Sequence, residues 1–270
     1  MKLRNEIPQF KLPVDFKYIE QANLAADIKN CLTSRSGGVK VIWAPCGSGK
    51  STTARSVLDA AFKRGEISGV IVLTPPKGEF IDPDEWFRAN LALFGIETLR
   101  PEDQLSDMLD SPMERPFVFV FDQCDNFEFN SATKRLIKTL AEDSVLCKKY
   151  VVIALCSSAH KARVMWNWNG RYKITLCSPG LQDAYKWSKR EIVEWVGNYL
   201  NLHPDSCLAD EAIRSKFIKA AEEAGCPEFL VINADPLMQA SVKSPEAIWD
   251  ESAKFYKNSW AVGKQELRWN

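Results

Sequence analysis

Short apolar runs alternate with longer amphipathic segments from about residue 39 to about residue 176 of this 270-residue chain. The apolar runs are rich in Val, Ile and Phe, and glycine or proline stands close to several of them. Runs this short are typical of buried β-strands, because helices of globular proteins usually need about ten residues or more. The predicted strands are Val39–Trp43, Val70–Leu73, Phe117–Phe121, Tyr150–Leu155 and Tyr172–Leu176.

The segments between these runs carry the apolar periodicity of helices. Helices are predicted over Ser51–Phe62 and Trp86–Phe94, and a third, capped by Ser131, holds Leu136. Strands that alternate with helices are joined by right-handed crossovers and therefore run parallel. Phe117–Phe121 is apolar throughout, as expected of a central strand with no face in water. We therefore predict an α/β fold, with a three-layer α/β/α core around a parallel five-stranded sheet.

Beyond residue 180 the pattern is helical, and no further strand is predicted. Ser188 and Glu191 have the spacing of a capping box at the start of one helix, and Ala209–Ala224 forms a second amphipathic segment. We predict two domains: a core over residues 1–181 that includes an N-terminal arm, and a small helical lid with a C-terminal tail over residues 182–270. The aromatic residues of the tail could cover the core or form a partner surface: Trp249, Phe255, Tyr256, Trp260 and Trp269.

Composition and charge narrow the classes of partner. The chain has 35 Lys and Arg residues and 35 Asp and Glu residues, so its formal net charge is zero. No overall field therefore draws it to nucleic acid or to an anionic membrane, although a local basic patch stays open. No apolar stretch is long enough to span a bilayer, and the first residues lack the apolar core of a signal peptide. We expect a soluble, unprocessed protein with no membrane partner.

The eight cysteines are scattered without a Cys-x-x-Cys pair, and only two histidines, His160 and His203, could join them. This pattern argues against a zinc site. Several of the cysteines fall in apolar strands, where Cys acts as a small buried hydrophobic residue. An intracellular, reduced compartment, the cytoplasm or the nucleus, is therefore the expected location.

A phosphate-binding P-loop follows the first predicted strand. Residues 44–51 read Ala-Pro-Cys-Gly-Ser-Gly-Lys-Ser, and only Ala44 departs from the usual pattern, which begins with Gly. A small residue can enter this turn as long as its φ stays negative. Successive main-chain N–H groups of such a loop point into one concavity and can surround a polyphosphate. The residues predicted to bind the nucleotide there are Pro45, Cys46, Gly47, Ser48, Gly49, Lys50, Ser51 and Thr52.

Two side chains of this loop add their own chemistry. Lys50 supplies a cation for the phosphates and is a candidate catalytic residue. Ser51, the first hydroxyl of the following helix, stands where a Mg²⁺ ligand is needed. The N-terminal end of that helix adds its positive dipole to the same place. The expected ligand is therefore a nucleoside triphosphate with Mg²⁺.

Two acids follow the strand Phe117–Phe121, in the order Asp-Gln-Cys-Asp. A carboxylate at this place next to a P-loop can hold Mg²⁺ through its water shell, and we assign that role to Asp122. A second acid can orient the attacking water. Gln123 occupies the position where many ATPases carry Glu, so either Asp125 has taken this catalytic role or hydrolysis is slow. Alternatively, the two acids only form the turn after the strand.

Ser157 follows the fourth predicted strand, which we expect to lie between the first and the third, beside the γ-phosphate. Its hydroxyl could act in catalysis by sensing that phosphate or the attacking water, or could simply belong to a turn. Arg163 and Arg171 follow on a polar connection. Either could reach the nucleotide of a neighbouring subunit as an arginine finger, or be a solvated surface residue.

Taken together, these segments resemble the AAA+ and STAND division of P-loop ATPases over about residues 20 to 240. Ala44–Ser51 is similar to the Walker A motif of that family, Phe117–Asp125 to its Walker B motif, and Ser157 to its sensor residue. The predicted helical lid comes after these three segments in the sequence, in the same order as in that family. The resemblance implies ATP and Mg²⁺ as cofactors, ATP hydrolysis between the β- and γ-phosphates, a nucleotide-dependent movement of the lid and assembly into homo-oligomers.

Two features favour the STAND side of this division. The segment Gly225-Cys226-Pro227 resembles the GxP motif of STAND proteins, which implies that Pro227 packs near the adenine. The spacing of Asp122 and Asp125 resembles the Walker B form of the same proteins. We expect adenine to be the base of the bound nucleotide, and this expectation rests on the resemblance alone.

Three other functions stay open. A nucleic-acid motor with one core per subunit, helicase-like or DNA-packaging, is favoured by Leu-Thr-Pro-Pro-Lys at residues 73–77, which looks like a strand-end motif that touches single-stranded DNA. A nucleotide switch or scaffold that hydrolyses ATP slowly is favoured by Gln123. A small-molecule kinase has less support, because no acceptor-site signature is evident. Besides ATP, a second copy of the chain, a protein partner and nucleic acid therefore stay open as partners.

Overall fold

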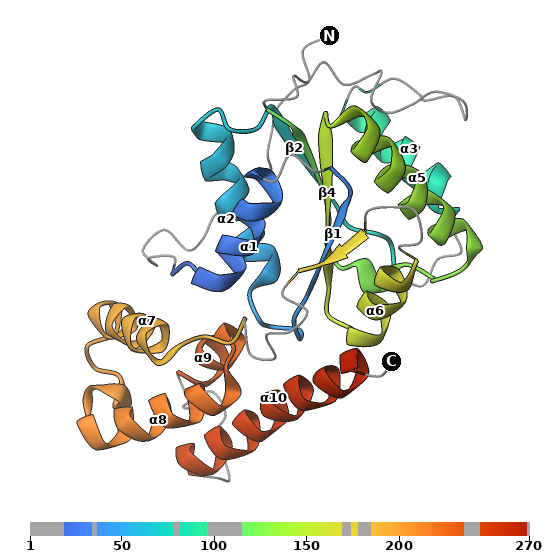
Figure 1. Ribbon diagram of the computed structural model, residues 1–270. Coiled ribbons are helices and arrows are strands. Elements are labelled where there is room, and N and C mark those ends of the chain that lie inside the picture. The colour runs from blue at the N-terminus through green and yellow to red at the C-terminus, as the bar shows by residue number, and fades with distance from the viewer. Residues whose placement is uncertain are drawn as a thin grey trace.

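The computed structural model describes residues 19–33, 37–77, 82–94, 96, 115–168, 174–177, 185–234 and 244–268. Figure 1 shows a sheet flanked by helices on both sides, with a second group of helices beyond one end of the strands. Arg171, Trp269 and the predicted domain boundary at residue 181 lie outside the described residues. Within these ranges, no helix is long and apolar enough to cross a membrane.

The described part of the chain contains a five-stranded parallel sheet, as the alternation of apolar runs predicts. The strand order is β2-β3-β4-β1-β5, so the fourth strand lies between the first and the third, as expected. Of the predicted strand at residues 172–176, only 174–176 can be compared, because 172 and 173 are not described. The strands are β1 (Val39–Trp43), β2 (Gly69–Leu73), β3 (Phe117–Phe121), β4 (Tyr150–Cys156) and β5 (Ile174–Leu176).

Helices cover both faces of the sheet, which gives the three layers predicted from the sequence. In Figure 1, α1 (Ala22–Thr33) and α2 (Lys50–Lys63) lie on one face. The helices α3 (Pro83–Leu93), α5 (Ser131–Cys147) and α6 (Ala159–Asn167) lie on the other. The chain moves one way along the sheet from β1 to β2 and the opposite way afterwards, so right-handed crossovers place α2 opposite the later helices.

Asn130, and not the predicted Ser131, caps α5. Asn130 has extended backbone angles, with φ of −105° and ψ of −172°, whereas Ser131 is already the first helical residue. The Oδ1 of Asn130 accepts the N–H groups of Ala132 and Thr133, each at 3.0 Å. Asn and Ser are both good caps, so the sequence alone does not decide between two neighbouring candidates.

Aromatic packing fixes β3 against the layer of α3. Every residue of β3 is buried. Phe119 and Phe121 meet Phe87 of α3 edge to face, with ring centroids 5.9 and 5.8 Å apart. Such pairs contribute about 0.5–1.5 kcal/mol each beyond the area that they bury. This packing holds the carboxyl end of β3, where Asp122 begins the following loop, in a defined place.

The helical region has a hydrophobic core of its own. α7 begins with the predicted capping box: the hydroxyl of Ser188 accepts the N–H of Glu191 at 3.3 Å, and Oε2 of Glu191 accepts the N–H of Ser188 at 2.6 Å. α8 begins two residues later than predicted, because Asp210 caps it and residues 207–209 form a separate 3₁₀ turn. The helices are α7 (Lys189–Leu202), α8 (Glu211–Ala224), α9 (Pro227–Asn233) and α10 (Pro245–Arg268).

One helix, α10, packs on both parts of the molecule (Figure 1). Trp249 and Tyr256 are buried in the core of the helical region, whereas Trp260 is buried in the core of the sheet layers. The ring of Trp260 meets Trp43 of β1 edge to face at 5.9 Å between centroids. Phe255 is 67% exposed. The tail therefore covers both cores, and the domain division at residue 181 stays a prediction.

Candidate nucleotide-binding site

The predicted P-loop joins β1 to α2 at the carboxyl edge of the sheet. Gly47 and Gly49 have φ of +74° and +84°, in the left-handed region that favours glycine. The N–H of Ser48 donates to the carbonyl of Pro45 at 3.3 Å and closes the turn. Ala44 is not among the described residues with positive φ, so alanine fits the first position of the loop as expected.

The ammonium group of Lys50 lies within this loop, and the residue is only 7% exposed. Nζ donates to the carbonyl oxygens of Ala44 at 2.6 Å and Pro45 at 3.0 Å, and to the hydroxyl of Ser157 at 3.0 Å. Burial lowers the pKa of Lys50, and nearby acidic groups, Cys46 first among them, oppose the shift. An anion beside Nζ would favour the charged form, because a full negative charge attracts the ammonium more strongly than carbonyl dipoles do.

The two residues predicted to lie near Mg²⁺ are in direct contact. Ser51 Oγ donates to Oδ1 of Asp122 at 2.6 Å. Asp122 is 4% exposed, and its Oδ2 lies 3.5 Å from the guanidinium of Arg55. A hydroxyl and a carboxylate are oxygen ligands of the kind that Mg²⁺ takes in nucleotide sites, so this donor set fits the ion.

Asp125 joins the loop after β3 to the end of β4. Its Oδ2 accepts the N–H of Ser157 at 2.5 Å, and its Oδ1 accepts the N–H of Ser158 at 2.9 Å. The main-chain carbonyl of Asp125 accepts a hydrogen bond from the ammonium of Lys161. Both carboxylate oxygens are therefore engaged with main-chain groups. The expected role of this residue in orienting the attacking water stays a prediction.

Ser157 lies beside the P-loop, as the strand order requires. Its hydroxyl accepts the hydrogen bond from Lys50, and its carbonyl accepts the indole N–H of Trp43 at 3.1 Å. The N–H of Ala44 donates to the carbonyl of Cys156 at 3.2 Å. These three contacts join the end of β4 to the start of the loop. They therefore fix the position of Ser157 relative to Lys50.

Gln123 has φ of 56° and ψ of 48°, a left-handed conformation that is uncommon outside glycine. Its Oε1 accepts a hydrogen bond from the amide of Asn126 at 3.3 Å, and the same amide donates to the carbonyl of Pro75 at 2.9 Å. The residue next to Asp122 therefore carries a neutral amide. An amide can orient a water molecule but cannot take up its proton as a carboxylate can.

The start of α9 touches the P-loop. The N–H of Glu228 donates to the carbonyl of Gly47 at 3.3 Å. A Cβ atom built on Gly49 would lie 3.3 Å from Cγ of Pro227. Pro227 therefore lies next to the loop that would hold the nucleotide, and its contact with the base stays a prediction.

The remaining predicted residues lie at the margin of this site. Cys46 is exposed in the loop, and Thr52 is half-buried in α2. The guanidinium of Arg163 donates to the carbonyl of Glu266 in α10 at 3.1 Å, so it contacts its own chain. Arg171 is not among the described residues. The arginine-finger role stays a prediction for both arginines.

Two charged residues beside the loop were not predicted. Arg55 contacts Asp122, and its position four residues after Ser51 places both on one side of α2, which is a signal that the sequence carries. Glu228 contacts Gly47. Nothing in the sequence indicates this second contact, because it depends on how the helical region is placed on the sheet.

Comparison with known proteins supports the fold. No family model and no curated protein matches the chain. Among solved structures, the Walker-type ATPase PABY2304 of Pyrococcus abyssi matches with a TM-score of 0.55 and 13% identity, over 92% of this chain and 75% of that one. The chain has the fold of a P-loop ATPase. The resemblance to P-loop ATPases is therefore confirmed for the fold, and the assignment to the STAND side stays a prediction.

Two further structures match less closely. Drosophila ORC bound to DNA has a TM-score of 0.44 and 14% identity, and the match covers 92% of this chain and 59% of that one. PCH-2 of C. elegans has a TM-score of 0.43 and 12% identity, with 87% of this chain and 68% of that one covered.

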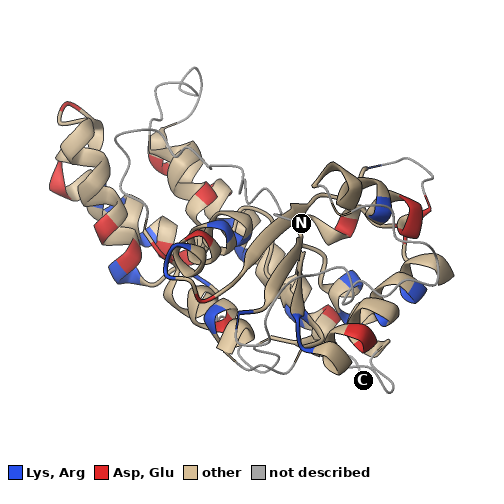
Figure 2. Cartoon of the chain, turned by 90° about the horizontal axis from the view of Figure 1, so that it is seen from above, with Lys and Arg blue, Asp and Glu red and all other residues tan. Residues whose placement is uncertain are grey.

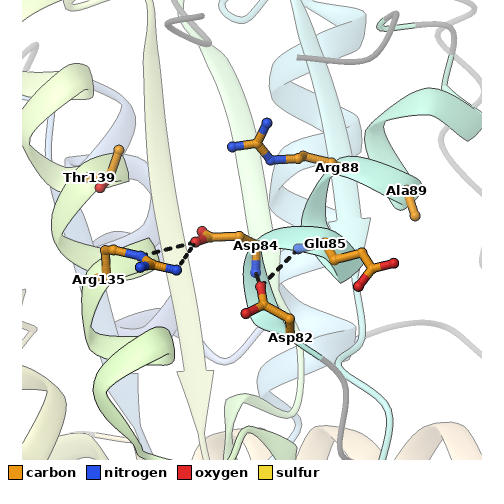
Figure 3. A pocket seen from close by; sticks show the side chains of 7 residues that line it. All are labelled: Asp82, Asp84, Glu85, Arg88, Ala89, Arg135 and Thr139. Atoms are coloured by element: carbon orange, nitrogen blue, oxygen red, sulfur yellow. Dashed lines mark hydrogen bonds and ion pairs between the residues drawn. The ribbon is translucent and has the colours of Figure 1, made fainter. Parts of the chain in front are cut away.

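A separate hollow of about 760 Å³ lies between α3 and α5, away from the P-loop (Figure 3). Arg135 of α5 faces Asp84 of α3 across it, with N–O distances of 3.2 and 2.9 Å. Asp82 caps α3 by accepting the N–H groups of Asp84 and Glu85. Asp84 thus joins α3 to α5, whereas Asp82 stabilises the start of α3. The hollow is lined by Asp82, Asp84, Glu85, Arg88, Ala89, Arg135 and Thr139.

Proposed function

We propose that this protein binds ATP together with Mg²⁺ at residues 44–51, hydrolyses the bond between the β- and γ-phosphates, and thereby changes the placement of α7–α10 relative to the sheet. The observation that carries the proposal is the meeting of Lys50, Ser51, Asp122 and Ser157 at one edge of the sheet. These four residues come from the P-loop and α2 and from the ends of β3 and β4. A turn with no ligand has no need of this combination of a cation, a carboxylate and two hydroxyl groups.

Each group has a task in binding a triphosphate. The main-chain N–H groups of the loop and the N-terminal end of α2 attract phosphate oxygens. Lys50 exchanges its contacts with loop carbonyls for a charge-assisted contact with phosphate. Ser51 and Asp122 would hold Mg²⁺, which would supply positive charge to offset the charge of the phosphates. The hydroxyl of Ser157 keeps the ammonium group directed at the same point.

The contacts of α9 and α10 support a link between the nucleotide and the helical region. The N–H of Glu228 is bound to the carbonyl of Gly47 inside the loop. Trp260 of α10 packs on Trp43, the last residue of β1 before the loop. A change in the loop therefore acts on two helices of the region at once. Such a change in contacts is what a ligand needs in order to shift an equilibrium between two placements.

A second candidate is a nucleotide switch that binds ATP and hydrolyses it slowly. It is favoured by Asp125, whose two carboxylate oxygens accept the N–H groups of Ser157 and Ser158. It is also favoured by Gln123, because an amide stands where a general base would be needed. In this case ATP binding alone would set the placement of α7–α10.

Binding of a fluorescent ATP analogue in the presence of Mg²⁺ tests the proposal. Lys50→Ala should abolish binding, whereas Lys63→Ala should not change it. Lys63 is a matched control because it ends the same helix, is 72% exposed and pairs with Asp59. Equal affinity of the two variants would overturn the proposed site. Single-turnover hydrolysis then separates the candidates, with about one event per second or faster for a working ATPase and on the order of one per thousand seconds for a switch.

Charge distribution gives little support to the nucleic-acid motor. In Figure 2 the Lys and Arg positions are interspersed with Asp and Glu positions along the described chain. Nucleic-acid binding depends on a local excess of positive charge and weakens steeply with salt. A several-fold rise of the ATPase rate with DNA or RNA, lost as salt rises, would favour the motor over the proposed function.

A further inference from the structure

A carboxylate of the helical region lies directly against the loop that would hold phosphate. Glu228, the second residue of α9, approaches Gly47 so closely that a Cβ atom built on Gly47 would overlap with Oε2, Cδ and Cβ of Glu228. The main chain makes the same contact, with the N–H of Glu228 3.3 Å from the carbonyl oxygen of Gly47. The absence of a side chain at Gly47 is therefore needed for this approach as well as for its φ of +74°.

A tyrosine of a second helix lies near this carboxylate. The phenol of Tyr256, in α10, lies close enough to Glu228 for the two side chains to interact electrostatically. Tyr256 is 7% exposed, and burial, followed by the negative charge of Glu228, raises its pKa well above the ordinary value. The hydroxyl therefore stays protonated and available as a donor. Within the described ranges, Glu228 forms no ion pair with Lys or Arg.

Glu228 lies in an unusual position, because among the described residues no Lys or Arg side chain pairs with its carboxylate. The main-chain N–H groups of the loop and the start of α2 attract negative charge. In the ligand-free protein this attraction favours the docking of Glu228, and with it α9, on the loop. A triphosphate brings several negative charges to the same loop, and like charges at short range repel.

We infer that Glu228 senses occupancy of the P-loop: its carboxylate docks α9 on Gly47 when the loop is empty, and the phosphates of a bound nucleotide repel it and release that contact. The inference rests on the proposed function, since it requires a phosphate ligand in the loop. It adds the residue through which that ligand acts on the helical region. Because coupling between two equilibria is reciprocal, docking of Glu228 must weaken nucleotide binding by the same factor by which nucleotide weakens docking.

Glu228→Gln tests the inference with the smallest change of shape, because it removes the charge and keeps the size of the side chain. ATP affinity should rise about fivefold or more, the lower end of typical coupling factors. Glu223→Gln is the matched control: it removes an exposed acid of α8, 3.6 Å from Lys257, and should leave affinity unchanged. Equal affinity of wild type, Glu228→Gln and Glu223→Gln would overturn the inference.

Hydrogen exchange at the amide of Glu228 gives a second readout, because this N–H is protected by Gly47 only while α9 is docked. In wild type, ATP with Mg²⁺ should speed its exchange. In Glu228→Gln, exchange should be fast already without nucleotide. Slower exchange on addition of ATP in wild type would overturn the inference.

These outcomes differ from failure of the proposed function. If wild type binds ATP no better than Lys50→Ala does, the nucleotide site itself is wrong. If wild type binds ATP and only the Glu228 comparisons show no effect, the site stands and the sensing role of Glu228 is wrong.

Discussion

Ser51 and Asp122 are 71 positions apart in the sequence, and Oγ of the first donates a 2.6 Å hydrogen bond to Oδ1 of the second. Ser51 lies in the first turn of α2, and Asp122 directly follows β3. The two strands that lead to them, β1 and β3, are not neighbours, since β4 lies between them. The parallel sheet therefore brings a hydroxyl and a carboxylate to one point at its carboxyl edge, where ligands of such sheets bind.

Asp122→Asn should remove most of the Mg²⁺ dependence of ATP binding. An amide cannot supply the negative oxygen that a hard cation prefers. ATP affinity should therefore differ strongly between Mg²⁺ and EDTA in wild type, and this difference should shrink by roughly tenfold or more in the variant. Asp59→Asn is the control, because Asp59 lies in the same helix as Ser51 and its carboxylate is 42% exposed. An unchanged response to EDTA in Asp122→Asn would contradict the assignment of Asp122.

Asp125→Asn should lower the stability of the protein as well as its ATP turnover. One oxygen of the new side chain can still accept an N–H, but the amide nitrogen must face the N–H of Ser157 or Ser158. Loss of one such bond costs about 1–3 kcal/mol in free energy of unfolding. Urea denaturation measures this cost, and single-turnover assays measure hydrolysis. A variant as stable as wild type but inactive would assign Asp125 a purely catalytic role.

Nucleotide affinity should fall as pH rises on the alkaline side. Burial lowers the pKa of Lys50 in the free protein, and a bound phosphate would raise it again. ATP affinity is therefore at its maximum below the pKa of Lys50 in the free protein. It falls as pH rises from that pKa to the higher pKa of Lys50 in the complex. In this window ATP binding takes up protons, which calorimetry in buffers of different ionisation enthalpy can count.

Lys50→Arg serves as the comparison for this pH dependence, because arginine keeps its charge throughout the accessible range. Its affinity should be lower at neutral pH, since the longer side chain fits the loop less well, but the alkaline loss should be absent. If ATP binding to wild type took up no protons at any alkaline pH, this would contradict the claim that bound phosphate raises the lowered pKa of Lys50.

Trp260→Ala should destabilise the protein far more than Phe255→Ala. Both residues lie in α10, but Trp260 is 2% exposed against Trp43, whereas Phe255 is 67% exposed. Truncation of a buried Trp costs about 3–5 kcal/mol in free energy of unfolding, and an exposed substitution changes it by about 0.5 kcal/mol at most. Urea denaturation provides both values. Similar values for the two variants would mean that α10 is not held against β1.

The sequence predicted the sheet and the loop because both are specified locally. Phe117–Phe121 is apolar throughout and too short for a helix, and it forms β3 as predicted. Gly47 and Gly49 stand where the backbone needs positive φ. The place of Ser157 beside Lys50 followed from the expected strand order, which the sheet confirms.

The parts that were not predicted depend on contacts between distant segments. α1 and α6 were not predicted individually, and the bounds of α10 were not predicted either, because its buried positions face two different cores. The contact of Glu228 with Gly47 requires α9 to lie on the loop, and no local pattern reports such placement. The hydrogen bonds from main-chain N–H groups to the carboxylate of Asp125 were not predicted either. An acid after a strand has the same sequence signature whether it binds metal, activates water or stabilises a turn.

The central claim is that the loop at residues 44–51 holds a triphosphate through its main-chain N–H groups and Lys50. Isothermal titration calorimetry of the full chain with ATP and Mg²⁺ tests it most directly. The account predicts a saturable heat with about one ATP per chain, as a single P-loop requires, and no such heat for Lys50→Ala. No heat with wild type, or the same isotherm for Lys50→Ala, would contradict it.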